Sequence, residues 1–444
     1  MSAHQFARTG GLFRFVVNNP HPNPYIGVMK FRAFFAFLIL TFGFCGFSSA
    51  SDLALIHAKI YPSPTASPIE DGTILIHEGR IRAIGPADKI KLPRFARSVT
   101  VLDCRGLVVT AGFWNSHVHI LTAGLLHAEK QAPEEISSQL EQMLTRWGFT
   151  TVFDTASILD NTNNIRRRIQ EGNVRGPRIL TVGEPFYPKG GTPVYIKGFL
   201  EENHIPSAEV QSTEQAIQRV RQQIKDGADG IKLFTGAITA HGVLPMPEEL
   251  AEALVSEAHR LGKPVFAHPS NTEGMEVAIQ SGVDVLAHTA PMSGDWSPAY
   301  AKRLRAANLA LIPTLTMFDV EAKKAKVSAE ENELWIKQVV QELHAFSEAG
   351  GQILFGTDVG YTDHFDTEEE FRLMSRAGMN FQQILASLTT NPATRFGYVS
   401  HSGRIEKGMD ADLVVLDGDP AIDVGAFSKV RDVVRDGKLI YRAP

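Results

Sequence analysis

The chain has 444 residues, of which 43% are hydrophobic and 21% are charged, and its formal net charge is −5. This composition excludes a disordered or fibrous protein, because enough apolar residues are present to form a large core. The net negative charge argues against a nucleic-acid partner, which would call for a basic surface.

The first 50 residues differ from the rest in charge and hydropathy. From Met29 the chain has a short basic segment, an apolar run over residues 33–47 and the small residues Ser-Ser-Ala. This pattern is typical of a secretory signal (residues 1–50) that is cut after Ala50, with Met29 as the true start and residues 1–28 as an upstream extension. The apolar run is short for a membrane-spanning helix, and an uncleaved anchor is the alternative. We therefore expect an exported protein, periplasmic or secreted, without stable membrane insertion after signal cleavage.

Short β-type runs occur at both ends of the remaining chain. They cover residues 54–60, 73–76, 80–84, 99–102, 413–416 and 438–441. Turn pairs separate them, namely Asp71-Gly72, Glu78-Gly79 and Asp436-Gly437. We predict that residues 51–110 and 400–444 fold together as one small β-sandwich domain.

The middle of the chain, residues 111–399, alternates helices with short apolar strands. Residues 132–147 and 247–261 show the helical period of apolar residues, and the second helix stops at Gly262. Eight strands are predicted at residues 107–120, 150–154, 178–182, 230–234, 264–268, 283–288, 309–314 and 352–358. Apolar strands that alternate with helices form parallel sheets, and eight such units predict an α/β fold, a closed (β/α)₈ TIM barrel. An open doubly wound sheet is the alternative.

Polar residues recur where these strands end. A glycine that ends a helix is followed about six residues later by Asp154, Lys232, His268, His288 or Asp358. The carboxyl ends of barrel strands converge on one face, which is where the active sites of such barrels lie. We therefore expect these side chains to lie near one another.

His117 and His119 end the first barrel strand. Residues i and i+2 of a strand point to the same side, so two imidazoles can face one metal ion while Val118 faces away. Two solvated loop histidines are the alternative interpretation.

Lys232 lies inside the apolar strand at residues 230–234. Burial disfavours its charged form and favours a nucleophilic amine that can react with CO₂ to give an anionic carbamate ligand. The alternative is a lysine in a salt bridge with a barrel carboxylate.

His268, His288 and Asp358 follow short apolar strands. A single histidine there is usually a hydrogen-bonded core residue, and a single aspartate is often a helix N-cap, but together these residues add ligands to the same face. Nitrogen and oxygen ligands without thiolates suit Zn²⁺ first, and also Mn²⁺, Co²⁺ or Fe²⁺. The sequence therefore predicts a divalent metal site at this face.

Three motifs in this chain resemble those of the amidohydrolase superfamily. They are AGFWNSHVH at residues 111–119, LTTNPA at 388–393 and RIEKGMDADLVV at 404–415. The match is similar to the imidazolonepropionase-like and prolidase-like subgroup, and Asn115 stands where an acidic residue is usual. The resemblance spans nearly all of the chain after residue 50.

The resemblance implies a binuclear metal centre. His117 and His119 would bind the more buried ion with Asp358, and His268 and His288 would bind the other. Carboxylated Lys232 would bridge the two ions, and Asp358 would be the general base. The implied nucleophile is a hydroxide that bridges the metals.

The implied reaction is hydrolysis of an amide or peptide C–N bond in a small molecule such as an N-acyl amino acid, a dipeptide or a cyclic amide. A lactonase or phosphotriesterase on the same site is the alternative. A deaminase is disfavoured because Asn271 stands where one-metal deaminases have glutamate, and a non-catalytic binding protein is disfavoured because all six ligands are present. Candidate substrate contacts are His241, Tyr195, Tyr361 and His364 on the loops that follow the strands, and the resemblance suggests a homo-oligomer.

Overall fold

The computed structural model describes residues 52–92 and 99–444. The predicted signal at residues 1–50 lies outside this part of the chain. None of the helices that the structure describes combines the length and the apolar character that crossing a membrane requires.

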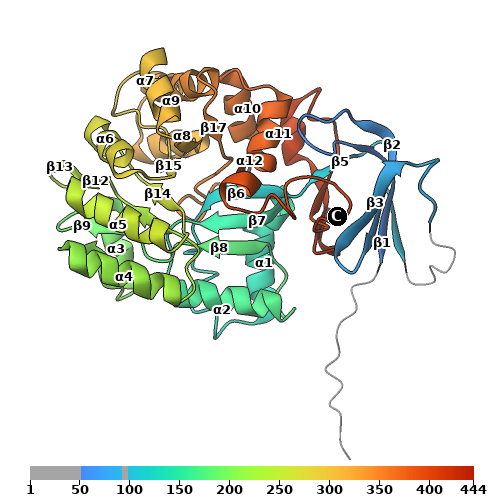
Figure 1. Ribbon diagram of the computed structural model, residues 1–444, viewed down its shortest axis with the longest axis horizontal. Coiled ribbons are helices and arrows are strands. Elements are labelled where there is room, and N and C mark those ends of the chain that lie inside the picture. The colour runs from blue at the N-terminus through green and yellow to red at the C-terminus, as the bar shows by residue number, and fades with distance from the viewer. Residues whose placement is uncertain (1–51, 93–98) are drawn as a thin grey trace, which may run out of the picture. The chain divides into compact units, whose positions relative to one another are not determined.

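The two ends of the described chain pair in one eight-stranded sheet. Its strands are β1 (Leu53–Ile60), β2 (Ile69–His77), β3 (Arg80–Pro86), β4 (Thr100–Asp103), β5 (Val108–Ala111), β18 (Leu413–Leu416), β19 (Val430–Arg435) and β20 (Lys438–Arg442). The order is β20-β19-β18-β5-β1-β2-β3, and β4 pairs with β1. The antiparallel pairing of β5 with β18 joins the two ends (Figure 1). The division of this sheet into the layers of a β-sandwich stays a prediction.

Two of the three predicted turns are hairpin turns. Glu78-Gly79 and Asp436-Gly437 have positive φ at both residues, as the tight turns that match the twist of a hairpin require. The prediction for Asp71-Gly72 was wrong, because both residues lie within β2, opposite an irregularity in β1. A Cβ at Gly72 would lie 2.3 Å from Ile60 Cδ1, so this glycine serves close packing rather than a turn.

Eight parallel strands form two further sheets in the described chain. The first contains β6 (Phe113–Val118), β7 (Phe149–Asp154) and β8 (Arg178–Thr181), and the second contains β11 (Ile231–Leu233), β14 (Val265–Ala267), β15 (Val285–Ala287), β16 (Ala310–Ile312) and β17 (Gln352–Ile353). Backbone hydrogen bonds link the sheets on both sides, from Phe186 N to Lys232 O (2.8 Å) and from Ser116 N to Phe355 O (2.7 Å). The arrangement is TIM-barrel-like.

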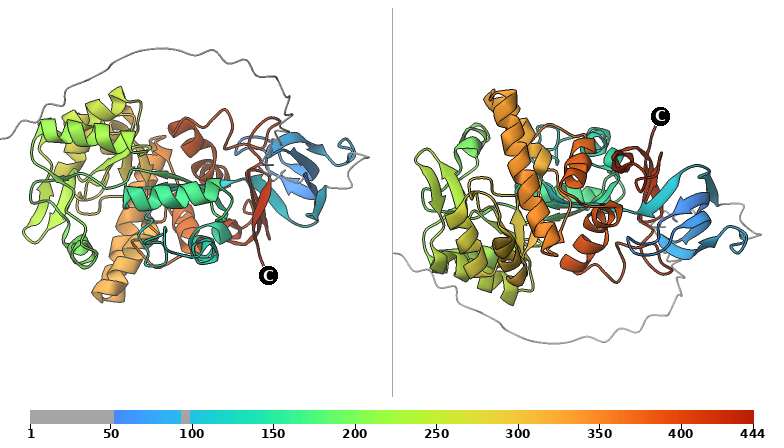
Figure 2. Two further views of the ribbon diagram at one scale, coloured as in Figure 1. Left: turned by 90° about the horizontal axis from the view of Figure 1, so that it is seen from below. Right: turned by 90° about the horizontal axis from the view of Figure 1, so that it is seen from above.

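Helices surround these strands, as Figure 2 shows from two sides. They are α1 (Pro133–Met143), α2 (Leu159–Gln170), α3 (Val194–Glu202), α4 (Thr213–Lys225), α5 (Glu248–Arg260), α6 (Thr272–Ser281), α7 (Pro298–Ala306), α8 (Leu315–Ala325), α9 (Ala329–Glu348), α10 (Glu368–Arg376), α11 (Phe381–Leu388) and α12 (Thr390–Arg395). Helix α5 has acidic residues in its first turn and basic residues in its last, which complements the helix dipole, and it buries one apolar face.

Alternation along the strands separates two apolar cores. Trp114, Phe153 and Phe266 belong to a cluster formed largely by strand residues. Their neighbours Phe113 and Val152 belong instead to the larger cluster that includes residues of the helices. Successive residues of a strand face opposite sides, so the first cluster fills the space between the strands and the second fills the layer beneath the helices.

The predicted strand at residues 107–120 is two strands in different sheets. It breaks at Gly112, whose N–H donates to Asp412 O at 2.8 Å. A Cβ at Gly112 would lie 2.2 Å from Thr150 Oγ1, so only glycine lets the chain pass from β5 to β6 this closely. The apolar run alone gave no sign of this change of sheet.

The loop after β17 lies against the end of β6. His119 N donates to Val359 O at 2.8 Å, and Gly360 has a φ of +100°. A Cβ at Gly360 would lie 1.9 Å from His119 O, a backbone atom that has little freedom to move. The loop that carries Asp358 can therefore approach His119 only because residue 360 is glycine.

We expect Gly360→Ala to destabilise the protein more than Gly172→Ala. Both positions have positive φ, which costs an alanine about 1 kcal/mol, but a Cβ at Gly172 meets nothing within 4 Å. Gly360→Ala adds a backbone clash, and we expect a loss of about 3 kcal/mol in the free energy of unfolding. Urea titrations of both variants measure this difference, and equal losses would contradict it.

Candidate metal centre

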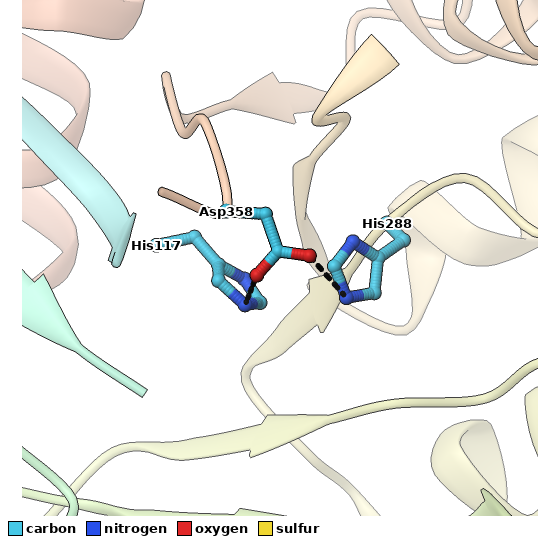
Figure 3. A group of neighbouring side chains, drawn as sticks. All are labelled: His117, His288 and Asp358. Atoms are coloured by element: carbon cyan, nitrogen blue, oxygen red, sulfur yellow. Dashed lines mark ion pairs between the residues drawn. The ribbon is translucent and has the colours of Figure 1, made fainter. Parts of the chain in front are cut away.

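Asp358 lies among the imidazoles of the predicted ligand set. Its Oδ1 is 2.8 Å from His119 Nε2 and 3.1 Å from His117 Nε2, and its Oδ2 is 4.0 Å from His288 Nε2. Figure 3 shows the carboxylate between the rings of His117 and His288. Burial alone would raise the pKa of Asp358, yet the surrounding imidazoles hold it well below its usual value.

The first strand brings both of its histidines to this carboxylate. Val118 packs in the larger apolar cluster, while the rings of His117 and His119 lie 5.2 Å apart between centroids. The pairing of β6 with β7 shifts register between Asn115 and Val118, and such an irregularity re-aims the side chains beside it. His119 Nδ1 donates to Ala156 O at 2.9 Å, which leaves its Nε2 as the acceptor facing Asp358.

His288 and Asp358 both have a left-handed backbone, with φ of 73° and 61°. Val285 belongs to the core between the strands and Leu286 to the core beneath the helices, so simple alternation would turn His288 outward. The left-handed residue breaks that alternation, and the His288 ring lies 4.7 Å from the ring of His117 between centroids. Strained backbone of this kind is typical of functional sites.

Thr314 fixes the tautomer of His288. Its Oγ1 lies 2.6 Å from His288 Nδ1 and donates to Pro313 O at 2.8 Å. A hydroxyl has one hydrogen, so at the histidine this oxygen accepts and Nδ1 carries the proton. The lone pair of His288 is therefore on Nε2, the nitrogen that faces Asp358.

Thr314 itself is strained, because it is β-branched and has a φ of 48°. It is the residue before α8 but makes no side-chain cap there. Glu370 on α10 caps that helix instead, accepting from Leu315 N at 2.9 Å and from Thr316 N at 2.7 Å. The threonine hydroxyl is thereby left for His288.

Lys232 lies at the same place with 2% of its surface exposed. Its Nζ is 3.4 Å from His117 Nε2, and none of the described carboxylates forms a salt bridge with it. Burial lowers the pKa of Lys232 to about 8, with Asp358 and Asp154 acting in the opposite direction. The salt-bridged alternative therefore does not describe this lysine.

His268 lies beside the group rather than in contact with Asp358. Its ring stacks on Phe234 at 4.6 Å and meets the ring of His288 at 4.8 Å, both between centroids. Burial holds the pKa of His268 well below its usual value, so the imidazole is neutral at pH 7. Burial acts in the same way on His117, whose pKa falls to about 3, and on His288.

These side chains fit a divalent metal. His117, His288 and Asp358 offer ligand atoms that all lie within 4.8 Å of one another. This group combines residues that the resemblance assigns to different ions. Asp358 Oδ1 is buried and makes no well-directed hydrogen bond within the described residues, which is costly unless another group satisfies it. Neutral imidazoles beside an ionised carboxylate are the form in which these groups bind metals.

A cavity of about 850 Å³ opens over this group, and its lining includes Lys232, His268, His288 and Asp358. Of the four predicted substrate contacts, Tyr195 and Tyr361 line it, with ring centroids 5.5 Å apart. His241 lies in the turn between β12 (Gly236–Thr239) and β13 (Gly242–Pro245), is exposed, and is not among the lining residues. His364 is exposed and outside the lining as well.

No pattern in the sequence marks Thr314 or Glu370 as part of the site. Both act through partners distant in sequence, so no local spacing marks them. Asp154 shows the opposite case, a strand-end residue with structural contacts. It accepts hydrogen bonds from Thr181 Oγ1 at 2.7 Å and from Ile120 N at 3.2 Å, and also from Ser157.

Comparison with known proteins identifies the family. The chain is 22% identical to ochratoxinase of Aspergillus niger over 88% of this chain and 87% of that protein, and 23% identical to imidazolonepropionase of Thermoplasma acidophilum over 78% and 83%. A solved structure of a Xaa-Pro dipeptidase with bound methionine matches with a TM-score of 0.75 and 25% identity, over 88% of this chain and all of that one. The model of the Amidohydrolase family matches residues 108–440. The chain therefore belongs to the amidohydrolase family and is a hydrolytic enzyme acting on C–N bonds.

Proposed function

We propose that this enzyme is an exported, metal-dependent hydrolase of amide or peptide-type C–N bonds in small molecules. The proposal rests on the close approach of the buried Asp358 carboxylate to His117, His119 and His288. Lys232 Nζ also lies 3.4 Å from His117 Nε2. Ochratoxinase, imidazolonepropionase and the Xaa-Pro dipeptidase, which resemble the chain over most of its length, support the reaction class.

We further propose that His117, His119, Lys232, His268, His288 and Asp358 hold two divalent ions, zinc first among the candidates, with Lys232 carboxylated by CO₂. The buried lysine supports this step, because burial favours the neutral amine that such a reaction needs. When bound, two such ions lower the pKa of water and polarise a carbonyl group.

The protein's own residues orient the imidazoles, transfer a proton and enclose the substrate. The Nε2 atoms of His119 and His288 point inward because Ala156 O and Thr314 Oγ1 hold the other ring nitrogens. Asp358 is ionised and accepts the proton of the attacking water at a carboxylate oxygen, then passes it to the leaving nitrogen. The cavity walls exclude water from the scissile bond and orient the substrate.

The proposal also covers the closure of the barrel, the small domain, export and the oligomeric state. The two parallel sheets act as one closed (β/α)₈ barrel over residues 111–399, and residues 51–110 and 400–444 form its small domain. Hydrogen bonds at both joins between the sheets support the closure. Residues 1–50 are a signal that export removes, and the mature enzyme forms a homo-oligomer.

A substrate panel tests the reaction class. We expect hydrolysis of at least one class of amide in a panel of N-acyl amino acids, dipeptides, cyclic amides and uncharged acyclic amides, and we expect chelation to abolish the activity. Asp358→Asn should lower kcat by about 10²-fold or more, because proton transfer is lost, while His241→Ala outside the cavity serves as the control. Turnover of only lactones or phosphotriesters by the wild type would replace the proposal with its alternative.

Thr314→Val tests the positioning of His288. We expect the affinity for added Zn²⁺ to fall about 10- to 100-fold, because the ring loses the partner that fixes its tautomer. Thr314→Ser keeps the hydroxyl and should retain most of the affinity. Calorimetric titration of the metal-depleted proteins measures both, alongside their free energies of unfolding. Equal zinc affinities in the two variants would show that the hydroxyl has no positioning role.

A further inference from the structure

The cavity above the candidate metal centre has mainly apolar walls. They include Phe199, Phe234, Ile238, Met317 and Phe318, which come from α3, β12, α8 and the loop after β11. A cavity of about 850 Å³ is at the upper end of the range for small-molecule sites, well above what a single amino acid fills. The walls can therefore make apolar contacts with a bulky substrate on several sides.

Apolar side chains also continue out to solvent at the cavity edge. Met292 is 61% exposed and Trp335 is 42% exposed, and both line the cavity. Single exposed apolar residues are ordinary, but exposed apolar residues that continue an apolar cavity indicate a binding surface. The entrance of the cavity is therefore apolar, like its interior walls.

Charged groups are few among the lining residues. Apart from Lys232 and Asp358 in the metal centre, the charged residues of the lining are Glu321 and Lys324 on α8. These two pair with each other, with Lys324 Nζ 3.0 Å from Glu321 Oε1, and the ammonium also lies 5.2 Å from the centre of the Tyr361 ring. No arginine is present in the lining described here.

A charged substrate would gain little from this arrangement. A free carboxylate would have to take Lys324 from Glu321, and a free ammonium would have to take Glu321 from Lys324. The Glu321–Lys324 pair is partly exposed and costs little to replace, so the unfavourable step is the desolvation of a new charge beside apolar walls. An uncharged substrate leaves the pair intact and buries apolar surface against the walls.

We propose that the substrate is a bulky, uncharged amide with apolar groups on both the acyl and the amine side and with neither a free carboxylate nor a free ammonium. The inference rests on the proposed function for the bond that is cleaved. It narrows that function, because dipeptides and N-acyl amino acids become poor substrates. In the hydrolysis, water adds to the carbonyl carbon, the C–N bond breaks, and the products are a carboxylic acid and a neutral apolar amine.

Three matched ligands test this class by binding alone. They share the shape of N-phenylacetyl-phenethylamine, and two of them add either a carboxylate, as in N-phenylacetyl-phenylalanine, or an ammonium, as in phenylglycine phenethylamide. Each is made as its trans-alkene isostere, which cannot be hydrolysed. Calorimetry with the purified enzyme should show the neutral ligand binding about tenfold or more tightly than either charged one. Equal or tighter binding of a charged ligand would overturn the proposal.

A pair of variants tests whether the apolar entrance sets this preference. Trp335→Lys places a cation in the cavity lining, whereas Leu334→Lys places one on the neighbouring residue, which is exposed and outside the lining. We expect Trp335→Lys to weaken the neutral ligand and strengthen the carboxylate ligand, and Leu334→Lys to behave as the wild type. An equal change of the two ligand affinities in both variants would show that the cavity wall does not set the preference for an uncharged ligand.

Turnover of the corresponding amides separates the two proposals. If the neutral isostere binds best and none of the amides is cleaved, the proposed function fails while the ligand class stands. If the carboxylate-bearing amide is cleaved fastest and Lys324→Met abolishes that preference, amide hydrolysis stands and the uncharged class is wrong.

Discussion

The buried carboxylate of Asp358 sets the main constraint on this structure. An ionised group inside a protein is tolerated only when a partner compensates the loss of water, and a divalent cation held by Oδ1 and the imidazole Nε2 atoms 2.8 and 3.1 Å from it would be such a partner. Reaching that position requires a left-handed Asp358, a glycine at 360 and a loop that lies on the backbone of His119. The fold tolerates this backbone strain because the surrounding parallel strands and helices bury a large apolar core.

The ring orientations depend on contacts outside the ligand set. His119 is held by a backbone carbonyl and His288 by Thr314, and Glu370 takes over the helix cap that Thr314 would otherwise supply. These contacts connect α10 to the site through α8. The walls of the cavity, in contrast, are apolar, so the polar atoms are concentrated at the place where a C–N bond would be cleaved.

The sequence predicted the features that depend on local pattern. Helix α5 agreed with its residue period to within one residue at each end, and the alternation of strands and helices placed His117 and Lys232 in strands β6 and β11. The predicted strand at residues 352–358 was too long, because β17 ends at Ile353 and Asp358 lies in the loop that follows. Features that depend on tertiary contact were missed or misjudged. Gly72 lies within a strand, Gly112 separates two sheets, and the left-handed His288 turns inward against simple alternation. Thr314 and Glu370 could not be predicted, because their partners are distant along the chain.

We propose that six side chains hold two metal ions, with Lys232 between them. The most direct test is the metal content of purified residues 51–444, with Lys232→Ala compared with Lys225→Ala, an exposed lysine at the end of α4. We expect about two metal ions per chain in the wild type and the control. We expect fewer ions in Lys232→Ala, with recovery on addition of a short carboxylic acid. One ion per chain that is indifferent to Lys232 would contradict the binuclear centre.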